Sequence, residues 1–296
     1  MTPALIAPEA APTDDASGPW SRIITPRRSF WEIPWRELWD YRGLLWTLTV
    51  RDLQTSYKQT VLGPFWFVVQ PLIVTVVFSY LFGRMAQFES EKIPHYVFYL
   101  GGLVPWQFFS ESVTKTANVF GTNAQLFSKV YFPRLIVPIS AILTNIVPLA
   151  VGTMLFLGGV VVYYCKHEPT IVPKWWIVLT PLLFVQLGAL ALGLGCIISA
   201  LTRRFRDLVY GVKIGLQLWM FGSAIVFPIA RIARADRWIF YLNPVVPPIE
   251  VFRAAFCAKP LIPIQYILIS TAVSFLTLLI GLIMFHRAEQ TAMDTV

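Results

Sequence analysis

Charged residues are unevenly distributed along the 296-residue chain and leave long apolar blocks between them. Six stretches contain no Asp, Glu, Lys or Arg: 59–83, 93–110, 135–165, 175–202, 214–230 and 260–286. A helix needs about 20 apolar residues to cross the hydrocarbon core of a bilayer. The pattern therefore predicts an all-α integral membrane protein with six spans, at about 61–83, 93–112, 135–164, 175–201, 208–228 and 262–285.

The segment 34–58, just before the first span, has a different pattern. At helical spacing its apolar residues form one face and its charged residues form the other. The apolar face carries Trp35, Trp39, Trp46, Val50, Leu53 and Tyr57, and the charged face carries Glu37, Asp40, Arg51 and Lys58. A tryptophan-rich face opposite a charged face is typical of helices in the lipid headgroup region, although a soluble helix packed on a protein core has a similar pattern. Because a span follows at once, we expect an interface helix that turns into the membrane at Gly63 and Pro64.

The segment between the fifth and sixth spans is the second irregular feature. Its uncharged part, 238–249, is too short to cross a bilayer and contains Pro244, Pro247 and Pro248. A short apolar run interrupted by prolines indicates a re-entrant or interfacial hairpin on the outer side. The alternative is a folded external loop with an apolar underside.

Composition agrees with a membrane protein, because 56% of the residues are hydrophobic, only 14% are charged, and the mean hydropathy is +0.62. Soluble domains have about 25% charged residues. The net charge of +8 is spread along the chain, which predicts attraction to anionic membrane lipids and no nucleic-acid site. With an even number of spans, and most basic residues on the inner side, both termini are predicted to be cytoplasmic. The domain then covers 34–286, between a disordered cytoplasmic tail at 1–33 and a short one at 287–296.

No motif for covalent chemistry is present. The sequence has no phosphate-binding GxxxxGK[ST] loop, no HExxH and no GxSxG, and its three histidines and three cysteines are widely separated. A Cys165–Cys257 disulfide on the outer side is left open. Carboxylates are absent from the middle of every span, which argues against ion-coupled transport and against a membrane enzyme with acid–base chemistry. We therefore predict no catalytic, metal-binding or cofactor-binding residue.

Several short motifs occur in order along the predicted spans, and together they resemble the ABC-2 type permeases that export polysaccharides. The resemblance covers about 35–286. The motifs are Arg51-Asp52, Tyr57-Lys58, Leu62-Gly63, Trp66, Pro71, Gly102-Leu103-Val104-Pro105-Trp106, Phe108-Phe109, Phe132-Pro133-Arg134, Phe205-Arg206-Asp207-Leu208, Ser223, Phe227-Pro228, Asn243-Pro244 and Phe252-Arg253.

This resemblance implies a homodimer bound to two copies of a separate nucleotide-binding ATPase subunit, which holds the ATP and Mg. The implied cargo is a lipid-linked polysaccharide of the O-antigen, capsule or teichoic acid type, moved across the bacterial cytoplasmic (inner) membrane without covalent change. Two alternatives remain: an ABC-2 permease for a lipid or drug-like cargo, and a membrane-embedded enzyme or scaffold.

The inner connections, 110–129 and 202–207, together with the interface helix, are the expected contact surface for the ATPase. The residues predicted to couple the two subunits are Arg51, Asp52, Lys115, Asn118, Arg203, Arg206 and Asp207. Alternatively, the arginines only bind anionic headgroups.

The fifth span has two contrasting faces. Lys213 and Gln217 share one face with Tyr210 and Phe221, whereas Gly211, Gly215 and Gly222 occupy the opposite face. A polar residue in a span usually faces protein or water, and small residues allow close helix packing. We therefore expect the first face to line a channel and the glycine face to press against another span. Across the channel, Phe67, Gln70 and Phe78 of the first span are the predicted partners; in the alternative, Gln70 and Gln217 only link helices by hydrogen bonds.

The outer hairpin is expected to narrow the exit of the channel, near the lipid headgroups or the emerging polymer. An arginine deep in the bilayer costs at least ~2.5 kcal/mol, so its arginines should lie at the mouth. The predicted outer-gate residues are Arg231, Arg237, Trp238, Tyr241 and Arg253.

Overall fold

The computed structural model describes residues 35–58, 60–85, 93–123, 126–127, 132–202, 205, 207–233 and 235–293. These residues all belong to one compact unit, 34–296. The predicted tail at 1–33, the last three residues of the chain, and Arg203 and Arg206 of the expected coupling surface lie outside the described residues. Within those ranges the chain is helical, and its strand-like pairing is limited to one isolated bridge.

The segment predicted as an interface helix is helical, as α1 (Trp35–Asp40) and α2 (Arg42–Tyr57), and its place at the membrane surface stays a prediction. Leu48 and Thr49 of α2 are buried, and the helix packs against α7 (Ile136–Thr144). Trp39 and Trp46 are 70% and 69% exposed. These two tryptophans are thus not packed on a protein core, which leaves them available to lipid.

Four of the predicted spans correspond to helical stretches that are long and apolar enough to cross a membrane: Gly63–Gly83, Ile136–Cys165, Trp175–Thr202 and Ile264–Ala288. Several of these stretches are made of more than one element. Their elements are η1 (Gly63–Phe65), α3 (Trp66–Phe78) and the π-helical η2 (Ser79–Met85); α7 and α8 (Ile146–Cys165); η3 (Trp175–Leu179) and α9 (Thr180–Thr202); and α13 (Ile264–Met293).

The predicted second and fifth spans lie on helices that are more polar or shorter. The second lies on α4 (His95–Ala117), which carries Glu111 and Lys115 and is followed by α5 (Val119–Thr122). The fifth lies on α10 (Leu208–Phe221), which has 14 residues and ends at Phe221 rather than at residue 228. Since a span needs about 20 residues, the count of six spans stays a prediction.

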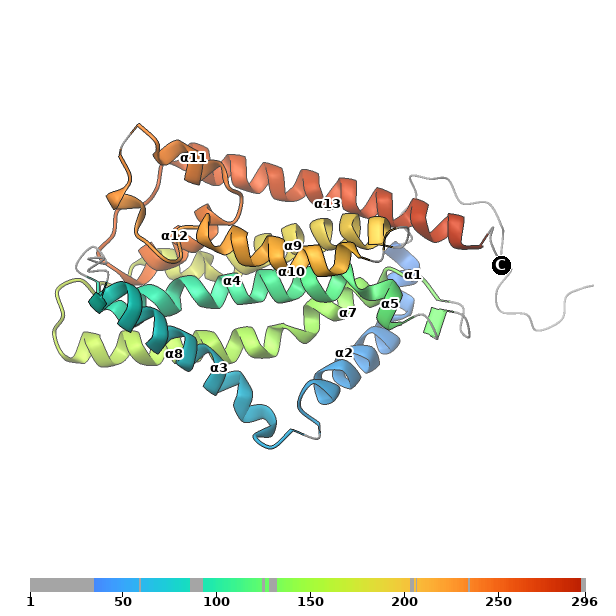
Figure 1. Cartoon of the computed structure of the whole chain (residues 1–296), viewed down its shortest axis with the longest axis horizontal. Coiled ribbons are helices and arrows are strands. Elements are labelled where there is room, and N and C mark those ends of the chain that lie inside the picture. The colour runs from blue at the N-terminus through green and yellow to red at the C-terminus, as the bar shows by residue number, and fades with distance from the viewer. Residues whose placement is uncertain are drawn as a thin grey trace, which may run out of the picture. The chain divides into compact units, whose positions relative to one another are not determined.

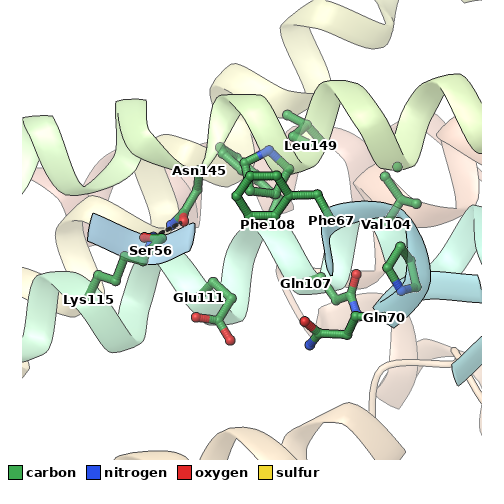
Figure 2. Close-up of a pocket in the computed structure, with 13 residues that line it drawn as sticks. Ser56, Phe67, Gln70, Val104, Gln107, Phe108, Glu111, Lys115, Asn145 and Leu149 are labelled. Carbon is green, nitrogen blue, oxygen red and sulfur yellow. Dashed lines mark hydrogen bonds between the residues drawn. The ribbon is translucent and has the colours of Figure 1, made fainter. Parts of the chain in front are cut away.

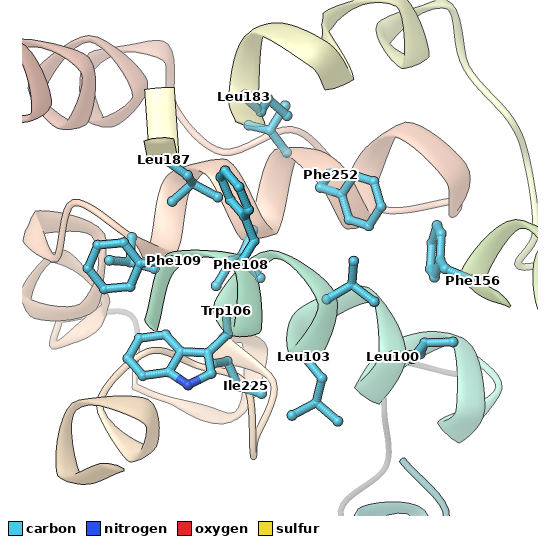
Figure 3. Close-up of a cluster of buried hydrophobic side chains, with 14 of the residues drawn as sticks. Leu100, Leu103, Trp106, Phe108, Phe109, Phe156, Leu183, Leu187, Ile225 and Phe252 are labelled. Atoms are coloured by element: carbon cyan, nitrogen blue, oxygen red, sulfur yellow. The ribbon is translucent and has the colours of Figure 1, made fainter. Parts of the chain in front are cut away.

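Helix α4 occupies the middle of the bundle, where it packs against α3, α7, α8, α9 and α10 (Figure 1). It also contacts α12 (Val246–Phe256) of the outer segment. Its apolar side chains form the core together with residues of α8, α9 and α12 and with Ile225 (Figure 3). The buried residues drawn there include Leu100, Leu103, Trp106, Phe108, Phe109, Phe156, Leu183, Leu187, Ile225 and Phe252.

The backbones of α9 and α13 approach each other closely at two glycines. A Cβ atom on Gly193 would collide with the backbone of Thr277 and Leu278, and one on Gly281 would collide with the backbone of Gly193. The α9–α13 contact therefore depends on the missing side chains at these positions, as in other closely packed membrane helices.

The outer segment between α10 and α13 folds into η4 (Ile229–Arg231), α11 (Arg237–Leu242) and α12. Every residue of α12 is buried, and Cys257 after it forms the isolated bridge with Ile171. Cys165 and Cys257 are both free, so the disulfide that the sequence left open is not formed. The two short helices α11 and α12 are consistent with the expected hairpin. Its re-entrant position in the membrane stays a prediction.

Candidate functional site

A pocket of about 250 Å³ lies between the first part of α3, the middle of α4 and the junction of α7 and α8 (Figure 2). Ser56, near the end of the interface helix α2, also lines it. The apolar part of the wall includes Phe67, Phe108 and Leu149. Because the pocket combines aromatic side chains with amide and charged groups, it has the character of a binding site for a small polar molecule.

One side of the pocket is held in place by a buried hydrogen-bond relay. Lys115 donates from Nζ to Oδ1 of Asn145 at 2.7 Å, and Nδ2 of Asn145 donates to Oγ of Ser112 at 3.0 Å. Asn145 and Ser112 are 3% and 0% exposed. The relay fixes the Lys115 ammonium against α7 and links α4 to the point where α7 ends and α8 begins.

Three other polar side chains of the pocket have no such partners. Gln70 of α3 and Gln107 and Glu111 of α4 point to the same side in Figure 2. Among the described residues, no side-chain hydrogen bond or ion pair of these three groups occurs. Glu111 and Gln70 are exposed and Gln107 is partly exposed, so their polar atoms are available to a ligand.

The structure places only part of the predicted channel face of the first span around this pocket. Phe67 and Gln70 line it. Phe78 lies farther along α3 and packs against Phe82 and Tyr99, with ring centroids 5.3 and 6.1 Å apart. In this conformation Phe78 therefore belongs to the contact between α3 and α4.

The predicted channel residues of α10 lie on its open side. Tyr210 and Phe221 are 75% and 46% exposed, and Lys213 and Gln217 are exposed as well. The opposite side packs on α4, where Trp219 contacts Trp106 and Phe109. The expectation that the glycine face presses against another span is wrong within this chain. Among the described residues, a Cβ atom on Gly211 or Gly215 would meet nothing within 4 Å, because α10 is exposed on the glycine side as well as on the Lys213 side.

The expected coupling residues are partly joined to one another. Arg51 forms a salt bridge with Asp52 at 2.7 Å through Nη2, and the same nitrogen donates to Oδ1 of Asn123 at 3.2 Å. This contact connects α2 to the residue that follows α5. Lys115 instead forms part of the pocket, Asn118 donates to the carbonyl of Thr114 within α4, and Asp207 is exposed just before α10.

The predicted outer-gate residues separate into two groups. Arg231 and Trp238 are exposed, Tyr241 packs on Tyr266 with ring centroids 4.9 Å apart, and Arg237 donates to the carbonyls of Ile232 and Ala230 at 3.0 and 2.7 Å. Arg253 differs, because only 1% of it is exposed. The prediction that Arg253 lies at the outer mouth, near headgroups or polymer, is therefore wrong.

Arg253 instead ties the outer segment to the bundle. Its guanidinium donates to the carbonyl of Phe98 at 3.1 Å, to that of Ala224 at 2.9 Å and to Oε1 of Glu250 at 3.0 Å. It also lies over the Phe98 ring, 4.0 Å from the centroid, and next to Gly102, where a Cβ atom would collide with it. Five donors in a planar fork suit such a set of carbonyls. The burial is tolerated because Glu250, which also pairs with Lys259, supplies the opposite charge.

Among the pocket residues, Gln107 and Glu111 of α4 and Asn145 of the α7–α8 junction were missed by sequence reasoning, and Lys115 was predicted only as a coupling residue. Gln107, Glu111 and Lys115 recur every fourth position of an otherwise apolar helix, a polar stripe that could have indicated the pocket wall. Asn145 and Ser112 gave no comparable signal, because their pairing depends on how α7 docks against α4.

Comparison with known proteins places these features in context. The sequence pattern of the ABC-2 type transporter family matches residues 43–257. The chain is 31% identical over 247 residues to the O-antigen export system permease protein RfbA of Myxococcus xanthus, covering 82% of this chain and 91% of that protein. It is 28% identical to a Klebsiella pneumoniae protein of the same name (83% and 92% covered) and 26% identical to the polysialic acid transport protein KpsM of Escherichia coli (84% and 94% covered).

Proposed function

The chain belongs to the ABC-2 type transporter family, and on this premise we propose that it is the membrane permease subunit of an ATP-driven polysaccharide exporter. The observation that carries the proposal is the similarity to O-antigen export permeases, which extends over more than 90% of those relatives. The sequence has no phosphate-binding loop for ATP, which supports a separate ATPase subunit. The permease itself binds and guides its cargo and makes no covalent change in it.

We infer that the working unit is a homodimer with two ATPase subunits. The open side of α10 carries Lys213 and Gln217, and exposing these groups to hydrocarbon is unfavourable. A second copy, or a water-filled path between two copies, would remove that cost, and the unoccupied space beside Gly211 and Gly215 would admit a neighbouring helix. This arrangement favours a path that runs between the two subunits along α3 and α10.

The contact with the ATPase is proposed on the side where α2 and α5 meet. Arg51, Asp52 and Asn123 join these two elements, so movement of one is passed to the other. The pocket shares Ser56 of α2 with this region. The conformational change that ATP drives in the partner subunit would thus be transmitted to the pocket wall through a single helix, α2. We also propose that the protein lies in the bacterial inner membrane, with six spans and both termini in the cytoplasm.

Co-purification tests this function directly. The chain is expressed with the ATPase encoded beside its gene, purified into nanodiscs, and supplied with lipid-linked glycan extracted from the host membrane. We expect a stable complex whose ATP hydrolysis rises with the glycan, whereas the ATPase alone should not respond. Stimulation by phospholipid or by drug-like compounds, without a response to glycan, would favour a different ABC-2 cargo.

A further inference from the structure

The polar pocket between α3 and α4 has the composition of a sugar-binding site. Carboxylate and amide groups match the donors and acceptors of sugar hydroxyls, and aromatic faces match the apolar C–H surfaces of a sugar ring. The pocket offers Glu111, Gln107 and Gln70 for the first kind of contact and Phe67 and Phe108 for the second. Its volume of about 250 Å³ lies below the ~300–1,000 Å³ of sites for drug-sized ligands, which indicates space for one ring.

The electrostatics of the pocket favour an uncharged ring. Glu111 brings a negative charge for which the described residues offer no ion-pair partner within salt-bridge distance. Among the described residues of the wall, Lys115 is the one cation; its ammonium donates to Asn145 and its charge is offset by that of Glu111, so no net positive charge is left for an acidic sugar. A hydroxyl can donate to the Glu111 carboxylate, whereas an acidic sugar would bring a second negative charge next to it.

Further polar groups lie along the first span and α4 beyond the pocket. Beyond the pocket, Thr75 and Ser79 of the first span and His95 and Tyr99 of α4 each hold a buried polar atom that finds no hydrogen-bond partner among the described residues. Thr75 and Tyr99 are completely buried. Buried polar groups are nearly always satisfied, so these four atoms, like five others elsewhere in the described chain, call for water or a hydroxyl-bearing molecule as a partner.

We propose that the pocket formed by Gln70, Gln107, Glu111, Phe67 and Phe108 binds one uncharged sugar unit of the exported glycan at the start of a polar seam between α3 and α4. The proposal rests on the proposed function and adds the residues and the charge class of sugar. Glu111 accepts hydrogen bonds from ring hydroxyls, and Gln107 both accepts and donates them. The two phenylalanines contact the ring faces.

Binding is tested with the full transporter in nanodiscs and with lipid-linked glycan extracted from the host membrane. The measurement is the glycan concentration that gives half-maximal stimulation of ATP hydrolysis. Glu111→Gln and Gln107→Leu should each raise that concentration at least tenfold. The matched control is Glu168→Gln, which alters an exposed carboxylate after α8, outside the pocket. If both pocket variants respond like the wild type, the assignment of the pocket is wrong.

A labelling experiment provides a second readout that does not depend on ATP hydrolysis. Gln107→Cys is made in a Cys165→Ser background, and its reaction with a water-soluble thiol reagent is followed with and without glycan. The extracted glycan should slow labelling at least tenfold, and a polysialic acid oligomer, as an acidic probe, should protect much less. Equal protection by the acidic oligomer would overturn the charge selectivity, and no protection by either would mean that the seam holds water only. A wild-type complex that ignores the glycan altogether would instead overturn the proposed function.

Discussion

Arg253 and Glu250 lie one turn apart on α12 and form an ion pair at 3.0 Å, with about 1% of each side chain exposed. The same guanidinium donates to carbonyls of α4 and of the segment after α10. A single buried side chain therefore connects α12 to α4 and to the segment after α10, so its loss should weaken the contacts among all three.

Replacing Arg253 tests this connection. Arg253→Met should lower the free energy of unfolding by about 3–5 kcal/mol, because Glu250 would lose one of its two cations and the carbonyls of Phe98 and Ala224 would lose their donor. Thermal unfolding of the purified protein in detergent gives the measurement. Lys166→Met, which removes an exposed cation next to Tyr163, is the matched control and should change stability little. An unfolding midpoint for Arg253→Met equal to that of the control would contradict the connection.

The protonation of Glu250 should set the acid limit of stability. Burial by itself raises the pKa of this carboxyl, but the charges and hydrogen bonds of Lys259 and Arg253 outweigh it and hold the pKa below the ordinary value of 4.5. The ion pair therefore contributes its full stability above about pH 4.5 and loses it as the pH falls through the lowered pKa. Glu250→Gln should be less stable at neutral pH and should depend less on pH below 4.5. An acid slope unchanged from the wild type would argue against this role.

The contact between α9 and α13 should not tolerate a methyl group. In Gly281→Ala the new Cβ atom would meet the backbone of Gly193, and separation of the two helices should cost about 1–3 kcal/mol. The yield of monodisperse protein and its unfolding midpoint report the effect. Gly158→Ala on α8 is the control, since its Cβ atom would have no neighbour within 4 Å. Equal behaviour of the two variants would show that the helices can separate without cost.

The open face of α10 should face water or a second subunit in the assembled transporter. Single cysteines at Tyr210, Lys213, Gln217 and Phe221 should react with a water-soluble thiol reagent during transport, whereas one at the buried Leu216 should not. Gly215→Cys should form a disulfide with the same position of a second copy under oxidising conditions. If the four exposed positions label only after detergent is added, this face contacts lipid and the proposed path is wrong.

Arg51 should transmit the state of the ATPase without being needed for insertion. Arg51→Gln removes both its salt bridge with Asp52 and its contact with Asn123. We expect glycan export to fall about five- to tenfold, as for a moderate coupling free energy, with normal amounts of protein in the membrane. Arg42→Gln changes an exposed arginine at the start of the same helix and should leave export intact. Loss of export in both variants would indicate a general effect of charge on this helix.

The sequence by itself determined the features that depend on local pattern. Apolar stretches of sufficient length must be helical in a bilayer, because only a helix satisfies the backbone within a single segment. The tryptophan face of the interface helix and the short proline-containing segment at 238–249 could be predicted because they too depend on the local pattern of residues. The ordered short motifs indicated the family, which the comparisons confirmed.

Only the tertiary structure decided what each polar side chain does, because that depends on partners distant in sequence. Arg253 was expected at the outer mouth since a lone arginine avoids the bilayer, yet Glu250, Lys259 and carbonyls of Phe98 and Ala224 make its burial possible. Gly211 and Gly215 share a stripe that predicts packing, but no helix in the described part of the chain covers them. The pocket likewise exists because α3, α4 and the α7–α8 junction leave space between them, and no single segment encodes that space.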